Sequence, residues 1–427
     1  MSYPDSVRYL YSLGNELKAG AKWGLERMQI LLDALGNPEQ GGRFVHVAGT
    51  NGKGSTCAMI ASMLKSAGLH TGLYTSPHLI EPTERIQVDG VPVTPEEFAR
   101  AFQVVHQAAE QMDGHPSYFE TVTAMALLVF GARCEIGVME VGLGGRLDAT
   151  NVIEPELCVI APVAYDHEAF LGNTIESIAS EKAGIIKRGA PVVMAQQTPA
   201  AEAVIAKRAQ EMGARLIRTE DARISDVSVT PYGSSFTIDG LKYECGLAGR
   251  HQIENAKSAI LACRELGMAQ DAIREGLRKV HWAGRLEFIS REPAFVLDGA
   301  HNPAAAGALA QYIREFWAER PVWLVYGAMR DKAIEEVTAQ LFPLAERLIV
   351  TAADFPRALR PEAIVEMAPH KNATVAGTVG AAIRLAEEAP RDAIVFFTGS
   401  LFVVGEARAL LAGKMGVHEE AARPAIR

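Results

Sequence analysis

The stretch Gly49-Thr50-Asn51-Gly52-Lys53-Gly54-Ser55 lies between two segments of regular pattern. Residues 44–47, just before it, are mostly apolar and predict a short strand. Residues 55–67, which follow, predict a helix that Gly68 ends. Residues 73–75 predict the next strand. A strand, a glycine-rich turn, a helix and a second strand, in this order, form the unit of a parallel sheet, so this stretch predicts an α/β fold.

The stretch also has the chemistry of a phosphate-binding loop. Its glycines let backbone N–H groups approach phosphate oxygens closely, and the start of the following helix adds partial positive charge. Lys53 can neutralise the outer phosphates, and Ser55 or Thr56 can offer a hydroxyl to Mg²⁺. Gly54 separates the lysine from the hydroxyl residue, unlike the common pattern. A glycine-rich turn with a solvated lysine is the alternative, but the flanking strand and helix favour a phosphate loop.

The alternation of strands and helices continues along the chain. Thr94-Pro95-Glu96-Glu97 predicts a helix start, because Thr94 can cap the helix and Glu97 can close a capping box. Residues 119–130 are apolar on nearly all sides and predict a buried helix. An amphipathic helix is predicted at residues 25–35, and short strands covered on both faces are predicted at residues 136–141, 157–161 and 191–195.

The second half of the chain predicts a separate domain. Residues 225–243 come close to period-two spacing and predict a small antiparallel meander attached to the main sheet, followed by helices at residues 252–266 and 271–280. A second α/β rhythm begins beyond Gly284, with strands predicted at residues 294–297, 322–326, 347–351 and 394–397. We therefore expect a phosphate-loop domain over residues 1–284 and a smaller Rossmann-like α/β domain over residues 285–427.

Composition excludes several classes of protein. The 427 residues carry 42 Lys plus Arg and 51 Asp plus Glu, for a net charge of −9, so the chain is not expected to bind nucleic acid generally. It contains no run near the ~20 apolar residues of a membrane span and no pattern of a signal peptide. The five cysteines form no C-x-x-C pair, so we expect small buried side chains rather than disulfides or a cysteine zinc site, and a cytoplasmic location.

Polar residues follow two further predicted strands of the first domain. Glu140 ends one strand and precedes a glycine-rich run, residues 142–148, whose backbone would approach a ligand closely. Asp166 and His167 follow the next strand. Because ligands collect at the carboxyl ends of parallel strands, Glu140 could hold a metal and His167 could ligate a metal or orient a phosphate. A solvated strand-end acid and a solvated loop histidine are the alternatives.

The second domain shows the same arrangement. Asp298-Gly299-Ala300-His301 follows a predicted strand, and Thr398-Gly399-Ser400 ends the last one. Asp298 could hydrogen-bond a ribose and His301 could reach a carboxylate or phosphate, whereas a helix-capping aspartate beside a glycine turn is the alternative. Loops of two α/β domains around one cleft are a common place for an active site. By spacing alone, Lys182 and Lys187 are ordinary surface lysines at a helix end.

These segments together resemble the folylpolyglutamate synthases of the Mur ligase superfamily, which in bacteria are often also dihydrofolate synthases. The resemblance covers nearly the whole chain and rests on residues 46–55, 74–79, 140–151, 166–172, 181–187, 249–256 and 298–303. We expect no further N-terminal nucleotide-sugar domain, which favours the folate branch over the peptidoglycan ligases. The resemblance also implies a cytoplasmic monomer that acts in folate biosynthesis and one-carbon metabolism.

The resemblance implies how ATP and metal would be bound. The triphosphate would lie against Lys53 and its neighbours Gly49, Thr50, Asn51, Gly52, Gly54, Ser55 and Thr56. Ser55 would bind one Mg²⁺, and Ser76, Glu140 and His167 a second. Asn255 would contact adenine, and Arg285 and Asp298 would reach the nucleotide from the linker and the second domain. Lys182 matches a lysine that family members carry as a carbamate, and a monovalent cation is a further cofactor that the resemblance allows.

The resemblance also implies the substrates: dihydropteroate, reduced folates and L-glutamate. Contacts to the incoming glutamate are expected from Arg85, His301 and Ser400, and contacts near the pterin from Phe119, Glu120, Thr121, Thr123, Leu147, Asp148 and Ala149. The chain departs from the family in Thr83-Glu84-Arg85-Ile86, where the family often reads Arg-Glu-Arg-Ile. Any contact that the first arginine makes to the glutamate tail is therefore not carried over.

The implied reaction is an ATP-dependent amide synthesis through an acyl phosphate, with Lys53, Lys182, Arg85 and His301 as the catalytic residues. Domain closure would keep water from that intermediate. Two rival hypotheses are a Mur-type ligase that acts on another carboxylic acid and a phosphate-loop ATPase without ligase activity. The sequence does not decide which acceptor is extended, the preferred one-carbon form or the length of the polyglutamate chain.

Overall fold

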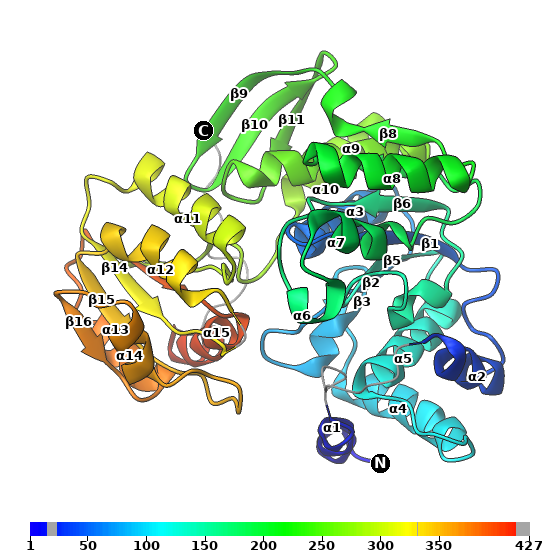
Figure 1. The fold of residues 1–427 in the computed structure, drawn as a ribbon, viewed down its shortest axis with the longest axis horizontal. Helices are drawn as coiled ribbons and strands as arrows, with labels where there is room; N and C mark the ends of the chain where they lie inside the picture. Colours follow the sequence, from blue (N-terminus) through cyan, green and yellow to red (C-terminus); the bar gives the residue numbers. More distant parts are fainter. Residues whose placement is uncertain (15–23, 331, 416–427) are drawn as a thin grey trace. The chain divides into compact units, whose positions relative to one another are not determined.

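The structure is a computed structural model that describes residues 1–14, 24–330 and 332–415. The chain divides into two compact units, whose elements are labelled in Figure 1. The first unit comprises Met1–Ser225, Thr237–Tyr243 and Glu254–Val280, and the second unit comprises Asp226–Phe236, Glu244–Ile253 and His281–Arg427 as far as it is described. The expected domain boundary at residue 284 stays a prediction.

The first unit is built on an eight-stranded sheet, as the predicted α/β class requires. The strands lie in the order β4 (Val91–Pro92), β3 (Ile86–Val88), β2 (Thr71–Tyr74), β5 (Ile136–Glu140), β1 (Arg43–Ala48), β6 (Leu157–Ile160), β7 (Val192–Met194) and β8 (Leu216–Arg218). All neighbours from β2 to β8 are parallel. At one edge, β3 pairs antiparallel with both β2 and β4. The predicted parallel-sheet fold is confirmed, and the antiparallel edge and β8 were not predicted.

Helices of the first unit pack around this sheet and supply its core. They are α1 (Tyr3–Ser12), α2 (Glu26–Ala34), α3 (Lys53–Ser66), α4 (Pro95–Ala109), α5 (Tyr118–Arg133), α6 (Glu168–Leu171), α7 (Ile175–Ala183), α8 (Pro199–Glu211) and α10 (Gln270–Lys279). The predicted capping box of α4 is present, with Thr94 and Glu97 bonded to each other's backbone N–H. Helix α5 is buried along most of its length, as its apolar sequence predicts.

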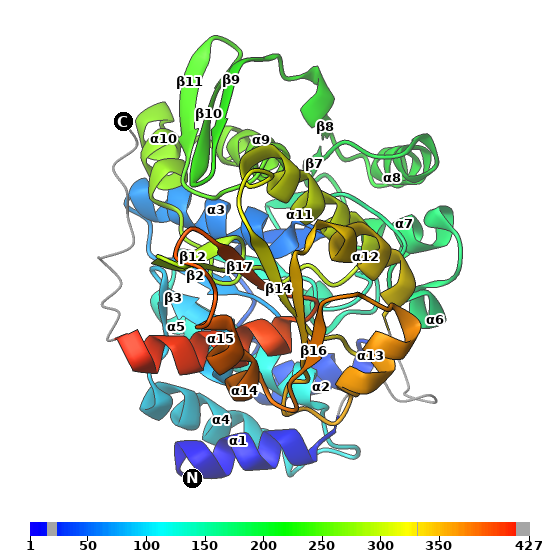
Figure 2. The same cartoon turned by 90° about the vertical axis from the view of Figure 1, so that its left-hand side faces the viewer.

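The helix that follows the phosphate-loop stretch is held by close packing. α3 lies beside α10 in both views of the molecule (Figures 1 and 2). The two backbones approach each other closely, because a Cβ atom at Gly276 would lie 2.3 Å from Cα of Met63. Only glycine permits this approach. The position of α3 therefore depends on a helix more than 200 residues later in the sequence.

The second unit contains a six-stranded sheet. Its order is β12 (Glu287–Arg291), β13 (Ala294–Leu297), β17 (Ile394–Thr398), β14 (Val322–Tyr326), β15 (Arg347–Val350) and β16 (Ala373–Val375). The pairs from β13 to β16 are parallel, and β12 is antiparallel. Helices α11 (Pro303–Phe316), α12 (Ile334–Leu341), α13 (Pro361–Met367), α14 (Val379–Ala386) and α15 (Leu401–Met415) complete this α/β arrangement. The four predicted strands are present, whereas the two edge strands β12 and β16 were missed.

The predicted meander takes a different form from the one expected. β9 (Ile224–Thr230), β10 (Gly233–Ile238) and β11 (Leu241–Cys245) form a separate three-stranded sheet rather than an attachment to the main sheet, and α9 (His251–Glu265) follows. The prediction of attachment was wrong because strand pairing across the chain cannot be read from local alternation.

The cysteines and the helix lengths can be compared with the expectations from composition. All five cysteines are free, and four are buried, whereas Cys134 is only partly buried, contrary to expectation. Within the described ranges, each helix is too short or too polar to cross a bilayer.

Candidate active site

Four neighbouring parallel strands, β2, β5, β1 and β6, end at one edge of the first sheet. The loops that leave these ends carry most of the residues expected to bind nucleotide and metal. The phosphate-loop stretch follows β1. Ser76 follows β2, Glu140 is the last residue of β5, and His167 lies in the loop after β6. The strand order thus collects at one edge residues that lie over 100 positions apart in the sequence.

The phosphate-loop stretch is shaped by glycines and tied to a neighbouring loop. Gly49 and Gly52 have φ values of 152° and 82°, and Gly52 directly precedes α3. The hydroxyl and the backbone N–H of Thr50 donate hydrogen bonds to the carbonyl oxygens of Ala164 (3.0 Å) and Pro162 (2.8 Å), respectively. The loop is therefore preorganised at a helix start, where backbone N–H groups lack partners within the helix.

Two lysines lie at this loop. The Nζ atom of Lys53 donates to the carbonyl oxygen of Thr50 (3.3 Å), and Nζ of Lys182 donates to that of Gly49 (2.9 Å). Lys182 is only 4% exposed, so the interpretation as a surface lysine was wrong for this residue, although it does lie in the last turn of α7. Burial, and then the charge of Lys53, lower the pKa of Lys182 to about 7. Lys187 is half-buried and bonds the carbonyl of Asn151.

The expected metal ligands lie around the same edge. One carboxylate oxygen of Glu140 accepts the backbone N–H of Ser76 at 3.1 Å, so these two residues are brought together. His167 precedes α6 in a left-handed conformation, φ 53°, and its Nε2 lies 3.8 Å from Asp166. Ser55 and Thr56 are buried in the first turn of α3, and the Thr56 hydroxyl has no hydrogen-bond partner among the described residues.

Asn255, from α9, lies directly against the phosphate-loop stretch. A Cβ atom at Gly52 would lie 2.2 Å from Oδ1 of Asn255. Asn255 is buried, so α9 places an amide beside the start of α3. The family resemblance implies that Asn255 contacts adenine. The structure places Asn255 at the phosphate-loop stretch, and its contact with adenine stays a prediction.

Arg85 lies in a buried setting that the sequence did not reveal. Its Nε donates to Nδ1 of His78 (2.9 Å), and its guanidinium lies 5.1 Å from the centre of the Tyr118 ring. Burial, and then Arg85, lower the pKa of His78 to about 3, so this histidine is neutral. Arg85 forms no ion pair with a carboxylate in the part of the chain that the structure describes. His78 and Tyr118 are the partners that sequence reasoning missed, although His78 lies inside the motif at residues 74–79.

The segment expected near the pterin is largely bonded within the protein. Glu120 accepts hydrogen bonds from Arg27 and Ser117 and closes the capping box of α5. The Thr121 hydroxyl bonds the Ser117 carbonyl, and the Thr123 hydroxyl lies 3.0 Å from that of Tyr74. These polar groups help to build α5, so their contact with a substrate stays a prediction.

The glycine-rich run after β5 is fastened by a buried carboxylate. The two oxygens of Asp148 accept the backbone N–H groups of Leu143 (2.8 Å) and Thr150 (3.0 Å), and burial raises the pKa of Asp148. The Nε2 atom of His46 lies 2.8 Å from the Thr150 hydroxyl, which itself donates to Asp148. Asp148 therefore shapes the loop from inside. Phe119 lies against Gly142 at the start of the run, and Leu147 and Ala149 flank Asp148.

The second unit gathers its expected residues at the ends of β13 and β17, which are neighbours. Asp298 accepts the backbone N–H groups of Leu286 (3.1 Å) and Ala300 (3.0 Å), and burial raises its pKa. Asp298 therefore holds its loop through backbone hydrogen bonds and does not cap α11, because the N-cap of α11 is Asn302. Arg285 lies close to Gly299: a Cβ atom added at Gly299 would be 2.3 Å from Nη1 of Arg285.

The two loops of the second unit are also bonded to each other. The backbone N–H of Gly399 donates to the carbonyl oxygen of Ala300 at 3.0 Å. His301 bonds the carbonyl of Gly299 through Nδ1 (2.8 Å), and the hydroxyl of Ser400, which is buried, accepts the backbone N–H of Phe402. His301 and Ser400 thus leave adjacent strand ends within this unit.

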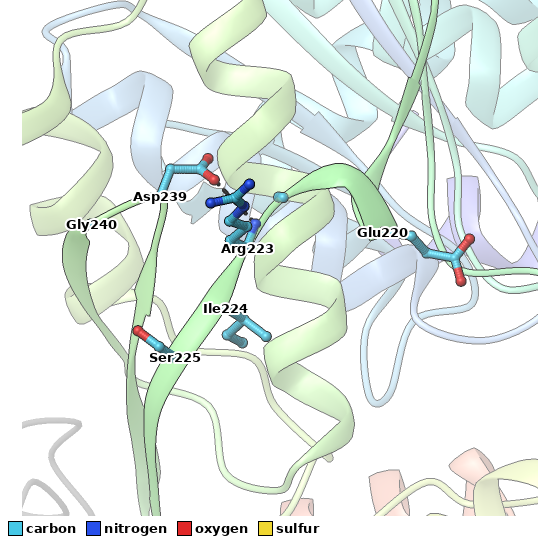
Figure 3. Close-up of a pocket in the computed structure, with 7 residues that line it drawn as sticks. Glu220, Arg223, Ile224, Ser225, Asp239 and Gly240 are labelled. Atoms are coloured by element: carbon cyan, nitrogen blue, oxygen red, sulfur yellow. Dashed lines mark hydrogen bonds between the residues drawn. The ribbon is translucent and has the colours of Figure 1, made fainter.

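A separate pocket lies where β9 begins and where β10 turns into β11 (Figure 3). Asp239 there accepts hydrogen bonds from the side chain of Arg264 (2.8 Å) and from the backbone N–H of Arg223 (3.1 Å), and these two bonds, Arg264 first, lower the Asp239 pKa. The pocket shares no residue with the site expected from the sequence.

Comparison with known proteins agrees with this geometry. The Mur ligase middle domain matches residues 47–263, and the Mur ligase, glutamate ligase domain matches residues 284–401. The chain is 38% identical to the dihydrofolate synthase/folylpolyglutamate synthase of Bacillus subtilis, over 95% of this chain and 98% of the relative. It is 36% identical to the folylpolyglutamate synthase of Lacticaseibacillus casei, over 97% of this chain and 99% of the relative.

Solved structures show the same likeness. The folylpolyglutamate synthase of Mycobacterium tuberculosis complexed with ADP and AMPPCP matches with a TM-score of 0.88 and 32% identity, over 96% of this chain and 99% of that chain. FolC of E. coli in complex with DHPP and ADP matches with a TM-score of 0.86 and 31% identity, over 96% and 98% of the two chains. The chain belongs to the Mur ligase family, in the group of ATP-dependent glutamate ligases formed by the dihydrofolate synthases and folylpolyglutamate synthases.

Proposed function

We propose that this ligase adds L-glutamate to reduced folates and also to dihydropteroate. The observation that carries the proposal is the arrangement at one sheet edge, where a glycine-shaped loop with Lys53 lies beside the buried Lys182 and next to the strand that ends in Glu140. That arrangement supports nucleotide binding and phosphoryl transfer. The relative from Bacillus subtilis, which is named for both activities, supports the choice of substrates.

The proposed nucleotide site follows the loop and its neighbours. Residues 49–56 would surround the triphosphate with backbone N–H groups, and Lys53 would neutralise the phosphoryl group that is transferred. Asn255, which lies against Gly52, would contact the nucleotide from α9. We assign Arg285 and Asp298 to the nucleotide as well, on the strength of the family resemblance.

The residues at the sheet edge fit Mg²⁺. Hydroxyl and carboxylate oxygens are the ligands that this ion prefers, and Ser55, Ser76 and Glu140 provide them. His167 follows β6, which is separated from the Glu140 strand β5 only by β1. When bound, Mg²⁺ supplies positive charge that stabilises the phosphates during transfer. The proposal extends to a monovalent cation and to a carbamate on Lys182.

The proposed glutamate and folate contacts begin with Arg85. A buried guanidinium that has a neutral histidine and an aromatic ring as neighbours, and no carboxylate partner among the described residues, is suited to bind a substrate carboxylate. We assign His301 and Ser400 to the incoming glutamate. The surfaces of Phe119, Leu147 and Ala149, with the backbone around Glu120, Thr121, Thr123 and Asp148, would lie near the pterin.

The proposed reaction has two steps. An oxygen of the acceptor carboxylate attacks the γ-phosphorus of ATP, the bond to the β-phosphate oxygen breaks, and an acyl phosphate and ADP form. The glutamate amine then attacks the acyl carbon, phosphate leaves, and one proton is released. Lys53 would hold the transferred group, and Arg85 would orient a carboxylate. We further propose a cytoplasmic monomer with the domain division at residue 284.

Incorporation of labelled glutamate tests this function directly. With Mg-ATP, the chain is expected to transfer label to both dihydropteroate and tetrahydrofolate, with one ADP released for each amide formed. Extension of only one acceptor would restrict the proposal to a single activity. ADP release that does not depend on glutamate would support an ATPase, and label transfer only to a sugar-nucleotide acceptor would support another Mur-type ligase.

A substitution at Gly52 is expected to weaken ATP binding. In Gly52→Ala the new Cβ would lie 2.2 Å from Oδ1 of Asn255, and φ of 82° would strain any residue with a side chain. We expect the KM for ATP to rise about tenfold, or ~1.4 kcal/mol, together with ~1–2 kcal/mol of lost stability in urea unfolding.

Gly189→Ala is the matched control for this experiment. Gly189 has a φ of 73° and open space where a Cβ would lie, so it carries the same backbone strain without the collision. Its stability loss should be similar and its KM for ATP unchanged. An unaltered KM in Gly52→Ala would contradict the placement of the nucleotide at this loop.

A further inference from the structure

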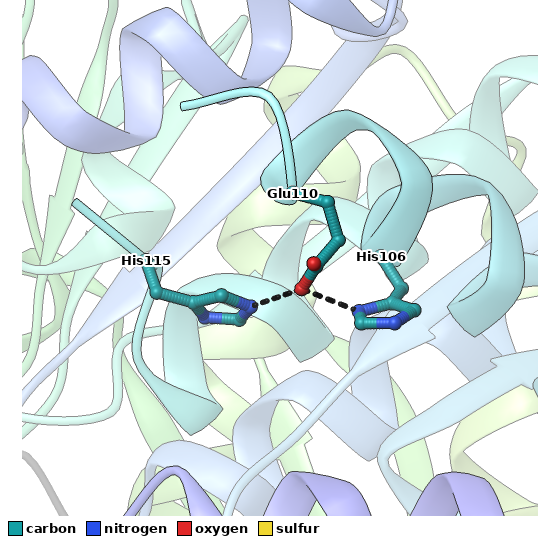
Figure 4. Close-up of side chains that lie close together, drawn as sticks. All are labelled: His106, Glu110 and His115. Carbon is teal, nitrogen blue, oxygen red and sulfur yellow. Dashed lines mark ion pairs between the residues drawn. The ribbon is translucent and has the colours of Figure 1, made fainter. Parts of the chain in front are cut away.

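Three side chains with metal-binding atoms cluster outside the set of residues assigned to the proposed active site. His106 and Glu110 lie four residues apart at the end of α4, and His115 lies in the segment between α4 and α5 (Figure 4). Figure 4 shows the Glu110 carboxylate between the two imidazole rings. None of the three has a role in the proposed reaction.

The ligand atoms are close together. Oε1 of Glu110 lies 3.7 Å from Nδ1 of His106 and 3.8 Å from Nε2 of His115. All three atoms lie within 4.8 Å of one another. Two ligands on a metal ion with bonds near 2.1 Å in tetrahedral geometry are separated by roughly 3.4 Å. Small side-chain rotations would therefore bring the three atoms onto one ion.

Each histidine turns one ring nitrogen toward Glu110, Nδ1 in His106 and Nε2 in His115. Nδ1 of His115 lies 2.8 Å from the carbonyl oxygen of Pro116, which can only accept, so in the neutral imidazole Nδ1 carries the hydrogen and Nε2 carries the free electron pair. This is the backbone contact that commonly orients a metal-binding histidine. Nδ1 of His106 is buried and has no hydrogen-bond partner within the described ranges. That atom is available to a metal at little cost in lost hydrogen bonds.

Aromatic side chains hold the site in shape. The His106 ring stacks on Phe102, with 5.4 Å between centroids and 9° between planes, and meets Tyr9 edge-on at 4.6 Å. The Tyr9 hydroxyl lies 3.3 Å from Oε1 of Glu110 and 3.1 Å from Nε2 of His115. Burial and Glu110 raise the Tyr9 pKa, so the hydroxyl stays protonated and acts as a donor. Preorganised ligands lose less entropy on binding.

We propose that His106, Glu110 and His115 bind one divalent transition-metal ion, with Zn²⁺ as the best match. Two imidazoles, one carboxylate and a water form a common zinc ligand set, whereas Mg²⁺ and Ca²⁺ prefer oxygen ligands alone. The ion would join the end of α4 to the segment that precedes α5, with Tyr9 of α1 hydrogen-bonded to its carboxylate ligand. It would thus stabilise the entry to α5.

The alternative for the same cluster is a pair of ion pairs between Glu110 and protonated histidines. Protonation has the opposite pH dependence to metal binding, which needs neutral imidazoles. Metal affinity should therefore fall as the solution is made more acidic, because protons compete with the metal for the imidazole nitrogens, whereas the ion pairs should strengthen. The N···O separations of 3.7 and 3.8 Å are also longer than those of hydrogen-bonded ion pairs.

Titration of the tag-free, metal-free chain with Zn²⁺ at pH 7.5 tests the proposal. We expect one ion to bind with an affinity that falls at least about tenfold in each of His106→Gln, Glu110→Gln and His115→Gln. His70→Gln is the matched control, because His70 pairs with a single carboxylate, Asp89 at 2.9 Å, and should leave the affinity unchanged. Bound Co²⁺ in place of Zn²⁺ should give a tetrahedral absorption spectrum that each of the three variants loses.

Two results would overturn this inference. One is an absence of Zn²⁺ binding to the unaltered chain. The other is equal Zn²⁺ affinity in the unaltered chain and the three variants, which would place any bound ion elsewhere, such as at Glu140. Circular dichroism and the thermal midpoint without metal should match in all chains, since the substituted side chains are at least partly exposed. This check separates lost binding from lost folding.

Discussion

Replacing Lys53 by alanine is expected to abolish glutamate-dependent ADP release, with a fall of roughly 10³-fold or more in kcat. Lys53 begins α3, and its Nζ folds back to the Thr50 carbonyl within the loop that would hold the triphosphate. In phosphoryl transfer the protein contributes mainly position and opposite charge. Loss of the positive charge of Lys53 is therefore expected to weaken stabilisation of the transition state more than it weakens ATP binding.

Lys65→Ala is the control for this prediction, because Lys65 lies at the other end of the same helix and bonds the Asp89 carbonyl. Its turnover should stay near that of the unaltered chain. Steady-state assays with both glutamate and a folate acceptor, together with equilibrium binding of ADP, separate catalysis from affinity. Near-normal turnover in Lys53→Ala would contradict the proposed site.

Lys182→Ala is expected to lower activity by roughly 10²–10⁴-fold, because we propose that its carbamate acts in the site. A pKa of about 7 leaves about half of the Lys182 amines neutral at pH 7, whereas an ordinary lysine is almost wholly protonated there. A neutral amine can attack CO₂, form an N–C bond and release a proton. The product is an anion, so the repulsion from Lys53 becomes attraction.

The pH and CO₂ dependence of activity check the carbamate itself. Since the pKa of Lys182 is lowered, its amine is neutral above about pH 7 and protonated below it, so activity should fall as pH drops through this value. Removal of CO₂ should lower activity severalfold, and bicarbonate should restore it. Lys182→Ala should show no response to bicarbonate, and Lys207→Ala, at an exposed lysine, should behave as the unaltered chain. Activity that is indifferent to CO₂ would contradict carbamylation.

Much of the fold could be predicted because its signals are local. The glycines around Lys53, the Thr94 capping box and the apolar run of α5 each depend on residues within a few positions of one another. Such patterns act through backbone sterics and hydrogen bonds inside one element. The strand ends that carry Glu140 and Asp298 were predicted in the same way.

Properties that depend on distant contacts could not be predicted. Sequence spacing predicted that Lys182 lies on the surface. In the structure Lys182 is buried and bonds the carbonyl oxygen of Gly49, 133 residues away in the sequence. Alternation predicted the strands β9 to β11 but not that they form a separate sheet. The partners of Arg85 and the metal-binding cluster around Glu110 likewise arise only when helices and loops meet.

The sequence by itself determined the α/β class, the phosphate-loop stretch and the family to which the chain belongs, because each is written in short contiguous motifs. Only the tertiary structure decided which charged groups are buried, which loops are bonded to each other and which side chains converge. The physical reason is that burial and electrostatic environment are set by strand order and helix packing, which join residues far apart in the sequence.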